Sequence, residues 1–219
     1  MDERRRRMSV SRHRLAAPFY DHFRPRTRFR EEAIGRLQLA PGQTVLDMGC
    51  GTGLSFELIQ EQIGSQGRII GAELSPDMLA RARQKVTAHG WQNVTLIEAA
   101  AEEADIPGEA DAALFYFTHD IMQSETALTN ALSHLKESGR VVAAGAKRPS
   151  RWWQLPANLA VLLIYWPFAT TTAGRARPWD KLEHLLPELR VEERSFGTMY
   201  MAYGSKWQVS RSIRRKPAK

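Results

Sequence analysis

The stretch VLDMGCGTG, residues 45–53, decides the fold. Pro41-Gly42 supplies a turn just upstream, and the β-branched Thr44 and Val45 favour a buried strand. Behind the stretch, the apolar residues of LSFELIQEQI (54–63) recur near helical spacing. The glycines between strand and helix tolerate positive φ and let the backbone approach another molecule closely, while the helix N-terminus offers unpaired N–H groups. We therefore expect a ligand to lie against this turn.

Strand-like and helical segments alternate along the following chain. Strands are expected at 44–48, 68–74, 94–99, 111–117 and 140–146, and helices at 54–63, 76–90 and 124–139. Ser75 is a suitable N-cap for the second helix, with Pro76 in its first turn. This alternation indicates βαβ units, and hence an α/β fold whose parallel sheet carries helices on both faces.

The two ends of the sequence depart from this alternation of strands and helices. Residues 15–39 predict two helical segments broken near Pro25. Residues 178–189 predict a helix, and 190–198 and 199–209 predict two strands joined by a tight turn around Gly197. The length of 219 residues suits one domain with a full core. We assign this domain to residues 15–207, with a helical cover at 15–40 and an aromatic insert or lid at 150–177.

The net charge of +7 is concentrated near the two ends of the sequence. Residues 1–14 contain six arginines against two acids, and residues 206–219 contain six basic residues and no acid. The rest of the chain is mildly acidic. We interpret 1–14 and 208–219 as basic flexible tails, which can contact nucleic acid or anionic lipid or simply stay solvated.

The cysteine content and the N-terminal residues indicate the cellular compartment. Cys50 is the only cysteine, which excludes an intrachain disulfide and a cysteine zinc site and fits a reducing cytosol. Residues 1–14 lead into no apolar core of the length that a secretory signal needs. A cytoplasmic location is therefore expected.

Two known types of glycine loop do not match the turn. Dinucleotide-binding loops have the pattern G-x-G-x-x-G, whereas Gly49, Gly51 and Gly53 form G-x-G-x-G and position 54 is leucine. The phosphate-binding pattern G-x-x-x-x-G-K-[ST] is also absent, because no lysine follows.

The motif DMGCGTG, followed by the acid Glu73 at the end of the next strand in IIGAELSPDML, resembles the class I S-adenosylmethionine-dependent methyltransferases. The resemblance covers roughly residues 20–148 and, more weakly, the two closing strands. It implies a doubly wound, Rossmann-like sheet of seven strands, mostly parallel with the last strand antiparallel. It also implies methyltransferase activity with S-adenosyl-L-methionine as cofactor.

The resemblance assigns the main cofactor contacts. Asp47 would hold the amino group of the cofactor through an ionic hydrogen bond, and Glu73 would accept both ribose hydroxyls. The glycine turn would cradle the methionine part and the ribose edge. The expected contacts of the turn are Gly49, Cys50, Gly51 and Gly53.

Further cofactor contacts are expected around the adenine and at the methionine end. Leu74 and Met78 are candidates to line the adenine pocket. Ala100 stands where the family often has an acid, so the backbone at Ala101 or the side chain of Glu102 would substitute. Further candidates are Phe117, where the fourth strand ends, and, for the methionine end, Tyr20; Arg24 or Arg28 would meet an anionic group.

Catalytic candidates follow the fourth strand, because ligands of such folds lie outside the carboxyl ends of the strands. His119 could act as a general base on the acceptor, or be a structural loop histidine bonded to the backbone. Asp120 could bind a substrate amine or cap the next helix. The six histidines form no close ligand pair, so no metal site is expected.

The acceptor is expected to meet the aromatic insert. Residues 152–174 carry no charge, but Pro156 and Pro167 interrupt the run, so we reject a membrane-spanning helix. Aromatic side chains can hold a cationic group or sit at a membrane surface, or they can be lid and core residues over a small pocket. The candidate substrate contacts are Trp152, Trp153, Tyr165 and Trp166.

These features predict N- or O-methylation of a small-molecule or lipid-like acceptor, with peripheral membrane contact. Transfer of the cofactor's aminocarboxypropyl group is an alternative, because the fold predicts the cofactor better than the bond broken. A nucleic-acid methyltransferase is less favoured, because FTHD (117–120) stands where such enzymes carry an Asn/Asp-Pro-Pro-aromatic tetrad. The sequence leaves the acceptor atom and the oligomeric state open.

Overall fold

The computed structural model describes residues 27–148, 174 and 176–206. Its strands are β1 (Thr44–Met48), β2 (Arg68–Glu73), β3 (Val94–Glu98), β4 (Ala110–Tyr116), β5 (Leu135–Ala146), β6 (Arg190–Arg194) and β7 (Met199–Ser205). The helices are α2 (Arg28–Arg36), α3 (Phe56–Ile63), α4 (Pro76–Ala88), α5 (His119–Met122), α6 (Glu125–Ser133) and α8 (Asp180–Leu185), with a 3₁₀ turn, η2, at Ser195–Gly197.

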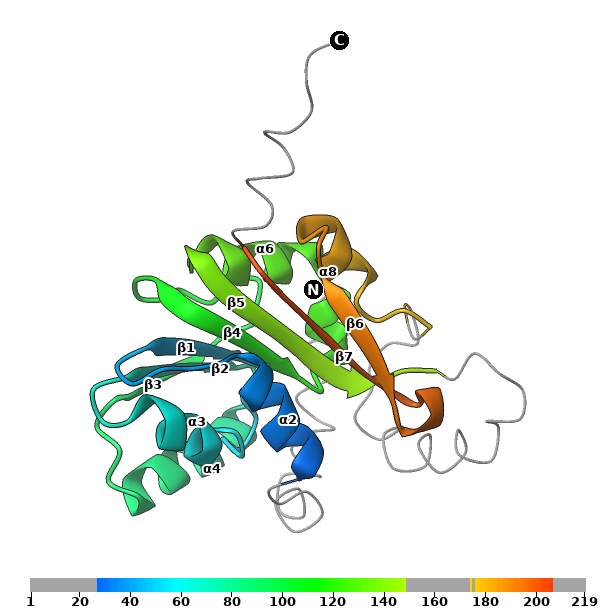
Figure 1. The fold of residues 1–219 in the computed structure, drawn as a ribbon. Helices are drawn as coiled ribbons and strands as arrows, with labels where there is room; N and C mark the ends of the chain where they lie inside the picture. Colours follow the sequence, from blue (N-terminus) through cyan, green and yellow to red (C-terminus); the bar gives the residue numbers. More distant parts are fainter. Residues whose placement is uncertain (1–26, 149–173, 175, 207–219) are drawn as a thin grey trace.

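All seven strands form one sheet in the order β3-β2-β1-β4-β5-β7-β6 (Figure 1). Strands β1 to β5 pair in parallel, and β7 pairs antiparallel with both β5 and β6. The predicted doubly wound sheet with an antiparallel last strand is therefore confirmed. Because β1, β2 and β4 are parallel neighbours, their carboxyl ends meet at one edge, where Asp47, Glu73 and Phe117 lie.

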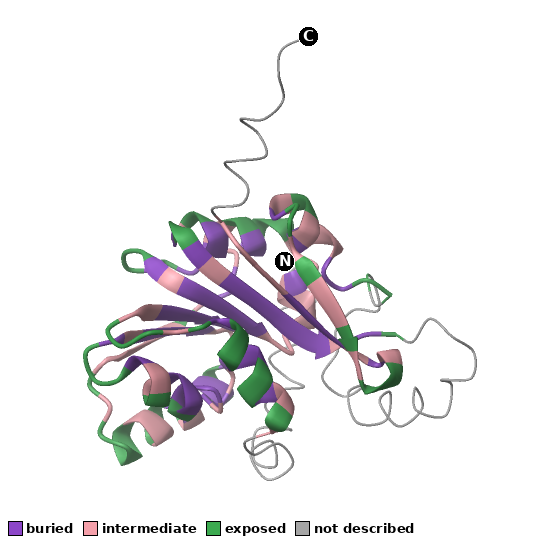
Figure 2. Cartoon of the chain, viewed as in Figure 1, coloured by how far each residue is buried: buried purple, intermediate pink, exposed green. Residues whose placement is uncertain are grey.

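Helices cover both faces of the sheet (Figure 1). One hydrophobic cluster joins α2, α3 and α4 to residues such as Val45, Ile69 and Leu114. A second joins α6 and α8 to residues on the opposite face, such as Leu46 and Phe115. The central strands are buried along most of their length (Figure 2), as expected for parallel strands with helices on both sides.

The helix predicted at 124–139 is wrong in its second half. Helix α6 ends at Ser133, and β5 already begins at Leu135. Leu135 pairs with Ala110 of β4 and is only 1% exposed, and the N–H of Ala110 donates to the carbonyl of His134. A register shift follows before Ala112 pairs with Arg140. Burial of Leu135 and its pairing with β4 thus outweigh the helical preference of the local sequence.

Smaller differences concern the ends of elements. The helix predicted at 178–189 is confined to Asp180–Leu185, and the first predicted helix begins at Phe56. Strand β4 ends at Tyr116, one residue earlier than predicted. The tight turn around Gly197 is confirmed as η2. Residues 1–26, most of the predicted insert and the C-terminal basic segment lie outside the described residues, so the proposed domain bounds stay a prediction.

We predict that Gly71→Ala destabilises the fold. A Cβ at Gly71 would lie 2.9 Å from Sγ of Cys50 and 3.0 Å from Cζ of Phe56, so it would overpack the region beneath the glycine turn. We expect a loss of about 1–3 kcal/mol in the free energy of unfolding, measured by urea denaturation. Gly35→Ala is the matched control, because nothing lies within 4 Å of its added Cβ in helix α2. This change should stabilise by about 0.5–1 kcal/mol, and equal effects of the two changes would contradict the packing account.

Candidate functional site

The glycine turn between β1 and α3 folds back onto the end of β2. The N–H groups of Gly49 and Cys50 both donate to the carbonyl of Ala72, at 2.8 and 3.1 Å. Gly49, Gly51 and Gly53 have φ values of 75, 57 and 74°, in the left-handed region that glycine tolerates. The sequence thus forms a bare backbone bend at the carboxyl edge of the sheet, as predicted.

Space around the three glycines differs. A Cβ at Gly49 would come within 2.5 Å of Cγ2 of Thr118, and one at Gly53 within 2.7 Å of the ring of Phe56. At Gly51 no atom lies within 4 Å of the added Cβ. Gly49 and Gly53 are therefore packed against protein, whereas Gly51 faces open space where a ligand could approach the backbone.

Glu73 ties the glycine turn to the start of α4. Its Oε2 accepts a hydrogen bond from the N–H of Gly51 at 3.0 Å, and its Oε1 accepts one from the N–H of Ser75 at 2.8 Å. An ionised carboxylate has about four acceptor positions, so each oxygen can still accept from a hydroxyl. Glu73 is thus fixed at the strand end where a diol such as a ribose could bind. The sequence did not predict its bond to the turn.

Asp47 is the most unusual polar group of the site. It is 2% exposed at the end of β1, and its Oδ2 has no hydrogen-bond partner within the described part of the protein. Burial raises the pKa of Asp47 from 3.8 to about 7; the charge of Arg30 lowers it and the charge of Glu73 raises it further. A buried carboxylate with an unsatisfied oxygen is costly, and a cationic donor placed against it would relieve that cost.

Arg30 is a site residue that sequence reasoning missed. It lies on α2 and is 3% exposed, and its guanidinium carbon lies 4.7 Å from the centroid of the Tyr116 ring. The signal was its helical spacing: Arg30, Ala33, Ile34 and Leu37 share the inward face of the helix and are all buried. The arginines predicted to meet an anionic group were Arg24 or Arg28; Arg28 is exposed, and Arg24 lies outside the described residues.

The residues predicted around the adenine follow β2 and β3 in the chain. Met78, in the first turn of α4, is 2% exposed, and Leu74 is half-buried between β2 and α4. Asn130 of α6 donates to the carbonyl of Ala101 at 3.0 Å, and Glu102 accepts a hydrogen bond from Oγ of Ser124 at 2.9 Å. The carbonyl of Ala101 and the side chain of Glu102, predicted to replace the acid that is absent at Ala100, are thus both held by hydrogen bonds from α6 or its N-cap residue. Their contact with adenine stays a prediction.

The catalytic candidates follow a strained residue. Phe117 has φ of 59°, which is unfavourable for a bulky side chain and occurs most often at functional sites. His119 and Asp120 lie in the short helix α5 rather than in a loop, and both are half-buried. Their side chains stay candidates for acceptor chemistry. Tyr20, Trp152, Trp153, Tyr165 and Trp166 lie outside the described residues.

Comparisons with known proteins match part of the chain to methyltransferases. The family described as Methyltransferase domain matches residues 45–139, from β1 into β5. The chain is 36% identical over 69 residues to the aklanonic acid methyltransferase DauC of Streptomyces sp. (strain C5), covering 32% of this chain and 31% of that protein. It is 33% identical over 85 residues to the demethylmenaquinone methyltransferase of Geobacillus stearothermophilus, covering 39% of this chain and 36% of that protein.

Residues 45–139 thus match a methyltransferase domain, and the sheet has the topology expected of class I S-adenosylmethionine-dependent methyltransferases. A solved S-adenosylmethionine-dependent methyltransferase from Aquifex aeolicus shares its fold, with a TM-score of 0.56 at 19% identity over 89% of this chain and 96% of that one. The cofactor predicted from the glycine motif is thus the one that this family uses. The matches span about a third of the length of each of the two relatives, 31% and 36%.

The described residues give two further findings. Among them, no helix has both the length and the apolar character required to cross a membrane. The same residues contain no cluster of three or more His, Cys, Asp or Glu side chains able to hold a metal ion.

Replacement of Asp47 tests its electrostatic state. Because its folded pKa of about 7 lies above the unfolded value of 3.8, folding takes up a proton between these values. The free energy of unfolding should therefore fall as the pH rises from about 4 to about 7. We predict that Asp47→Asn removes this fall and makes the ligand-free protein more stable than wild type by about 2–4 kcal/mol at about pH 8.

Urea denaturation at several pH values measures the effect. The difference between Asp47→Asn and wild type should shrink towards zero below about pH 4, because the wild-type carboxyl is then protonated in both states. Asp77→Asn, at an exposed position of α4, is the control and should change stability by less than about 1 kcal/mol. A gain in stability of Asp47→Asn that grew towards acid pH would contradict the account.

Proposed function

We propose that the chain transfers a methyl group from S-adenosylmethionine to a small-molecule acceptor. The observation that carries this proposal is the buried Asp47, whose Oδ2 has no hydrogen-bond partner among the described residues, beside the glycine turn. The methionine part of the cofactor carries an ammonium group, which would donate a charge-assisted hydrogen bond to this oxygen. Relatives named for demethylmenaquinone and aklanonic acid support an acceptor of small-molecule size.

Each part of the site has a role in this proposal. Asp47 holds the ammonium group of the cofactor, and Glu73 accepts the ribose hydroxyls while it stays bonded to the N–H of Gly51. The open side of Gly51 lets the backbone lie close to the ligand. Leu74 and Met78 line one side of the adenine, and Ala101 and Glu102 lie at its edge. When bound, the cofactor supplies an electrophilic methyl group on its sulfonium.

The acceptor would enter beside the start of α5. Displacement at a methyl group depends chiefly on alignment of the reacting atoms, so these residues act first by orientation. Phe117, held in the left-handed region, presents its ring at the end of β4 and contacts Phe29 at 6.2 Å between ring centroids. His119 is the proposed general base for an acceptor hydroxyl, and Asp120 orients the acceptor.

Finer features of the acceptor extend this proposal. We propose a lipid-like acceptor, N- or O-methylation, and peripheral contact with a membrane from a cytoplasmic location. These proposals are based on the aromatic residues of the insert and on the basic ends of the sequence. We place the enzyme in one domain of residues 15–207. The alternative reaction is transfer of the aminocarboxypropyl group of the same cofactor.

The reaction products distinguish methyl transfer from the alternative. We predict that incubation with S-adenosylmethionine and an extract of small molecules and lipids yields S-adenosylhomocysteine, measured by chromatography with mass detection. The Asp47→Asn variant under identical conditions controls for spontaneous breakdown of the cofactor and should yield at least about tenfold less product, because a charge-assisted hydrogen bond is lost. Formation of methylthioadenosine together with an aminocarboxypropyl adduct would contradict methyl transfer.

A paired substitution tests the ribose contact. We predict that Glu73→Gln weakens binding of S-adenosylhomocysteine by about 10- to 100-fold in calorimetric titration, because hydrogen bonds to a charged acceptor are lost. Glu98→Gln is the control, because Glu98 is the register partner of Glu73 at the end of β3 and its side chain is 48% exposed. Glu98→Gln should leave the affinity within about twofold of wild type. Equal affinities of both variants would remove Glu73 from the site.

A further inference from the structure

We propose that the hydroxyl of Tyr200 donates a hydrogen bond to an oxygen atom of the methyl acceptor, so that the acceptor is a compound with a carbonyl or hydroxyl group. Strand β7 would then contribute to the acceptor site together with the residues that follow β4. The inference rests on the proposed function, because it concerns the acceptor of the same reaction.

The position of Tyr200 brings its hydroxyl to the end of β4. Tyr200 lies on β7 and is the register partner of Gly145 on β5. A Cβ added at Gly145 would lie 3.7 Å from the hydroxyl oxygen of Tyr200 and 3.6 Å from Cα of Phe117. The ring of Tyr200 therefore lies over β5 at Gly145, with its hydroxyl beside the backbone of Phe117. This backbone leads directly into α5, which carries the proposed acceptor residues His119 and Asp120.

The hydroxyl of Tyr200 is suited to donate a hydrogen bond to a ligand. Tyr200 is 2% exposed, and burial raises its pKa; neither a charge nor a hydrogen bond of the described residues contributes to this shift. The phenol therefore stays protonated, and an oxygen atom of a ligand would compensate for the burial of its O–H group.

A second hydroxyl at the same strand end also lacks a partner. Oγ1 of Thr118, the residue after Phe117, is buried and has no hydrogen-bond partner among the described residues. Buried polar groups are usually hydrogen-bonded, so an orphaned hydroxyl indicates that a polar group of a ligand belongs nearby. The unused hydrogen-bonding capacity at the end of β4 thus favours an acceptor that carries oxygen.

Aromatic packing holds the ring of Tyr200 from the side of α8. The ring of Trp179 is buried, and its centroid lies 5.1 Å from that of Tyr200. Nζ of Lys147 lies 5.9 Å from the centroid of the Trp179 ring and forms an ion pair with Glu193 of β6 at 2.6 Å. Glu193 is the register partner of Tyr200 in the β6–β7 hairpin. This ion pair therefore ties the end of β5 to the hairpin at the position of Tyr200.

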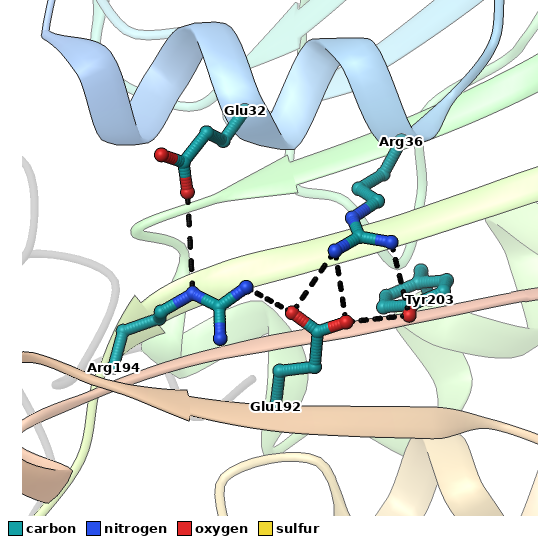
Figure 3. Close-up of polar contacts among 5 residues, drawn as sticks. All are labelled: Glu32, Arg36, Glu192, Arg194 and Tyr203. Carbon is teal, nitrogen blue, oxygen red and sulfur yellow. Dashed lines mark hydrogen bonds and ion pairs between the residues drawn. The ribbon is translucent and has the colours of Figure 1, made fainter.

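A polar network holds the opposite face of the hairpin (Figure 3). Glu192 of β6 accepts hydrogen bonds from the Arg36 guanidinium at 2.9 and 3.1 Å and from the Tyr203 hydroxyl at 2.6 Å. It also forms an ion pair with Arg194. The hydrogen bond from Tyr203 is the main cause that lowers the pKa of Glu192. The hairpin is thus fixed on both faces, and Tyr200 packs on the face opposite to that of Tyr203.

Paired tyrosine variants test the proposal, with the extract of small molecules and lipids as the source of the acceptor. Tyr200→Phe keeps the ring and removes only the hydroxyl. Initial rates of S-adenosylhomocysteine formation are measured at saturating S-adenosylmethionine over a dilution series of the extract. We expect the amount of extract at half-maximal rate to rise about 3- to 10-fold, because one uncharged hydrogen bond to the acceptor is lost. Tyr203→Phe, the matched control, should leave this amount within about twofold of wild type.

Two further measurements separate acceptor binding from a structural role. The maximal rate of Tyr200→Phe should stay within about threefold of wild type. Its affinity for S-adenosylhomocysteine in calorimetric titration should stay within about twofold, which also shows that the variant is folded.

Three results would overturn the proposal. These are an unchanged half-maximal amount of extract in Tyr200→Phe, an equal rise in both variants, and an acceptor, identified by mass analysis of the methylated product, that has no carbonyl or hydroxyl oxygen. Absence of S-adenosylhomocysteine formation by the wild-type protein would instead contradict the proposed function itself.

Discussion

The carboxylate of Asp47 is buried at the end of a central strand, with an oxygen that no hydrogen-bond donor of the described residues satisfies. Removal of a charged group from water is costly unless other groups compensate. Burial raises the pKa of Asp47 in the folded protein to about 7, and the charge of Arg30 offsets only part of this rise. The surrounding fold fixes the position of Asp47, so its carboxylate stays buried despite this cost. In the proposed function, the ammonium group of the cofactor supplies the missing hydrogen-bond donor.

The fold holds Asp47 from three directions. The glycine turn that follows it is tied to β2 through the carbonyl of Ala72, and Glu73 binds both the turn and the start of α4. Gly71, the register partner of Asp47, leaves the room that Cys50 and Phe56 occupy beneath the turn. Helix α2 adds the buried positive charge of Arg30 over Tyr116 at the end of β4, and ion pairs with Glu192 and Arg194 of β6 hold this helix. Packing and hydrogen bonding therefore hold the glycine turn, Glu73 and the buried carboxylate of Asp47 in fixed positions.

The sequence predicted the parts of the site that depend on local patterns. Asp47, the glycines and Glu73 lie within one strand–turn–helix–strand unit, so their convergence follows from parallel pairing alone. Arg30 was missed because its role depends on the packing of a helix against distant strands, although its place on the apolar face of that helix was readable. The predicted helix at 124–139 was wrong because Leu135 gains more from burial beside β4 than its polar neighbours gain from helix formation. The short helix α5 with His119 and Asp120, which follows the positive φ of Phe117, was likewise not predicted.

Proton release on ligand binding tests the central claim most directly. At about pH 6, the buried carboxyl of the ligand-free protein should be largely protonated, and an ammonium bound against it should drive the proton off. Calorimetric titration of S-adenosylhomocysteine in buffers of different ionisation enthalpy measures the number of protons released. We predict release of nearly one proton per ligand at about pH 6, little release at about pH 8.5, and none at either pH in Asp47→Asn. Binding without proton release in the wild type, or identical release in Asp47→Asn, would contradict the account.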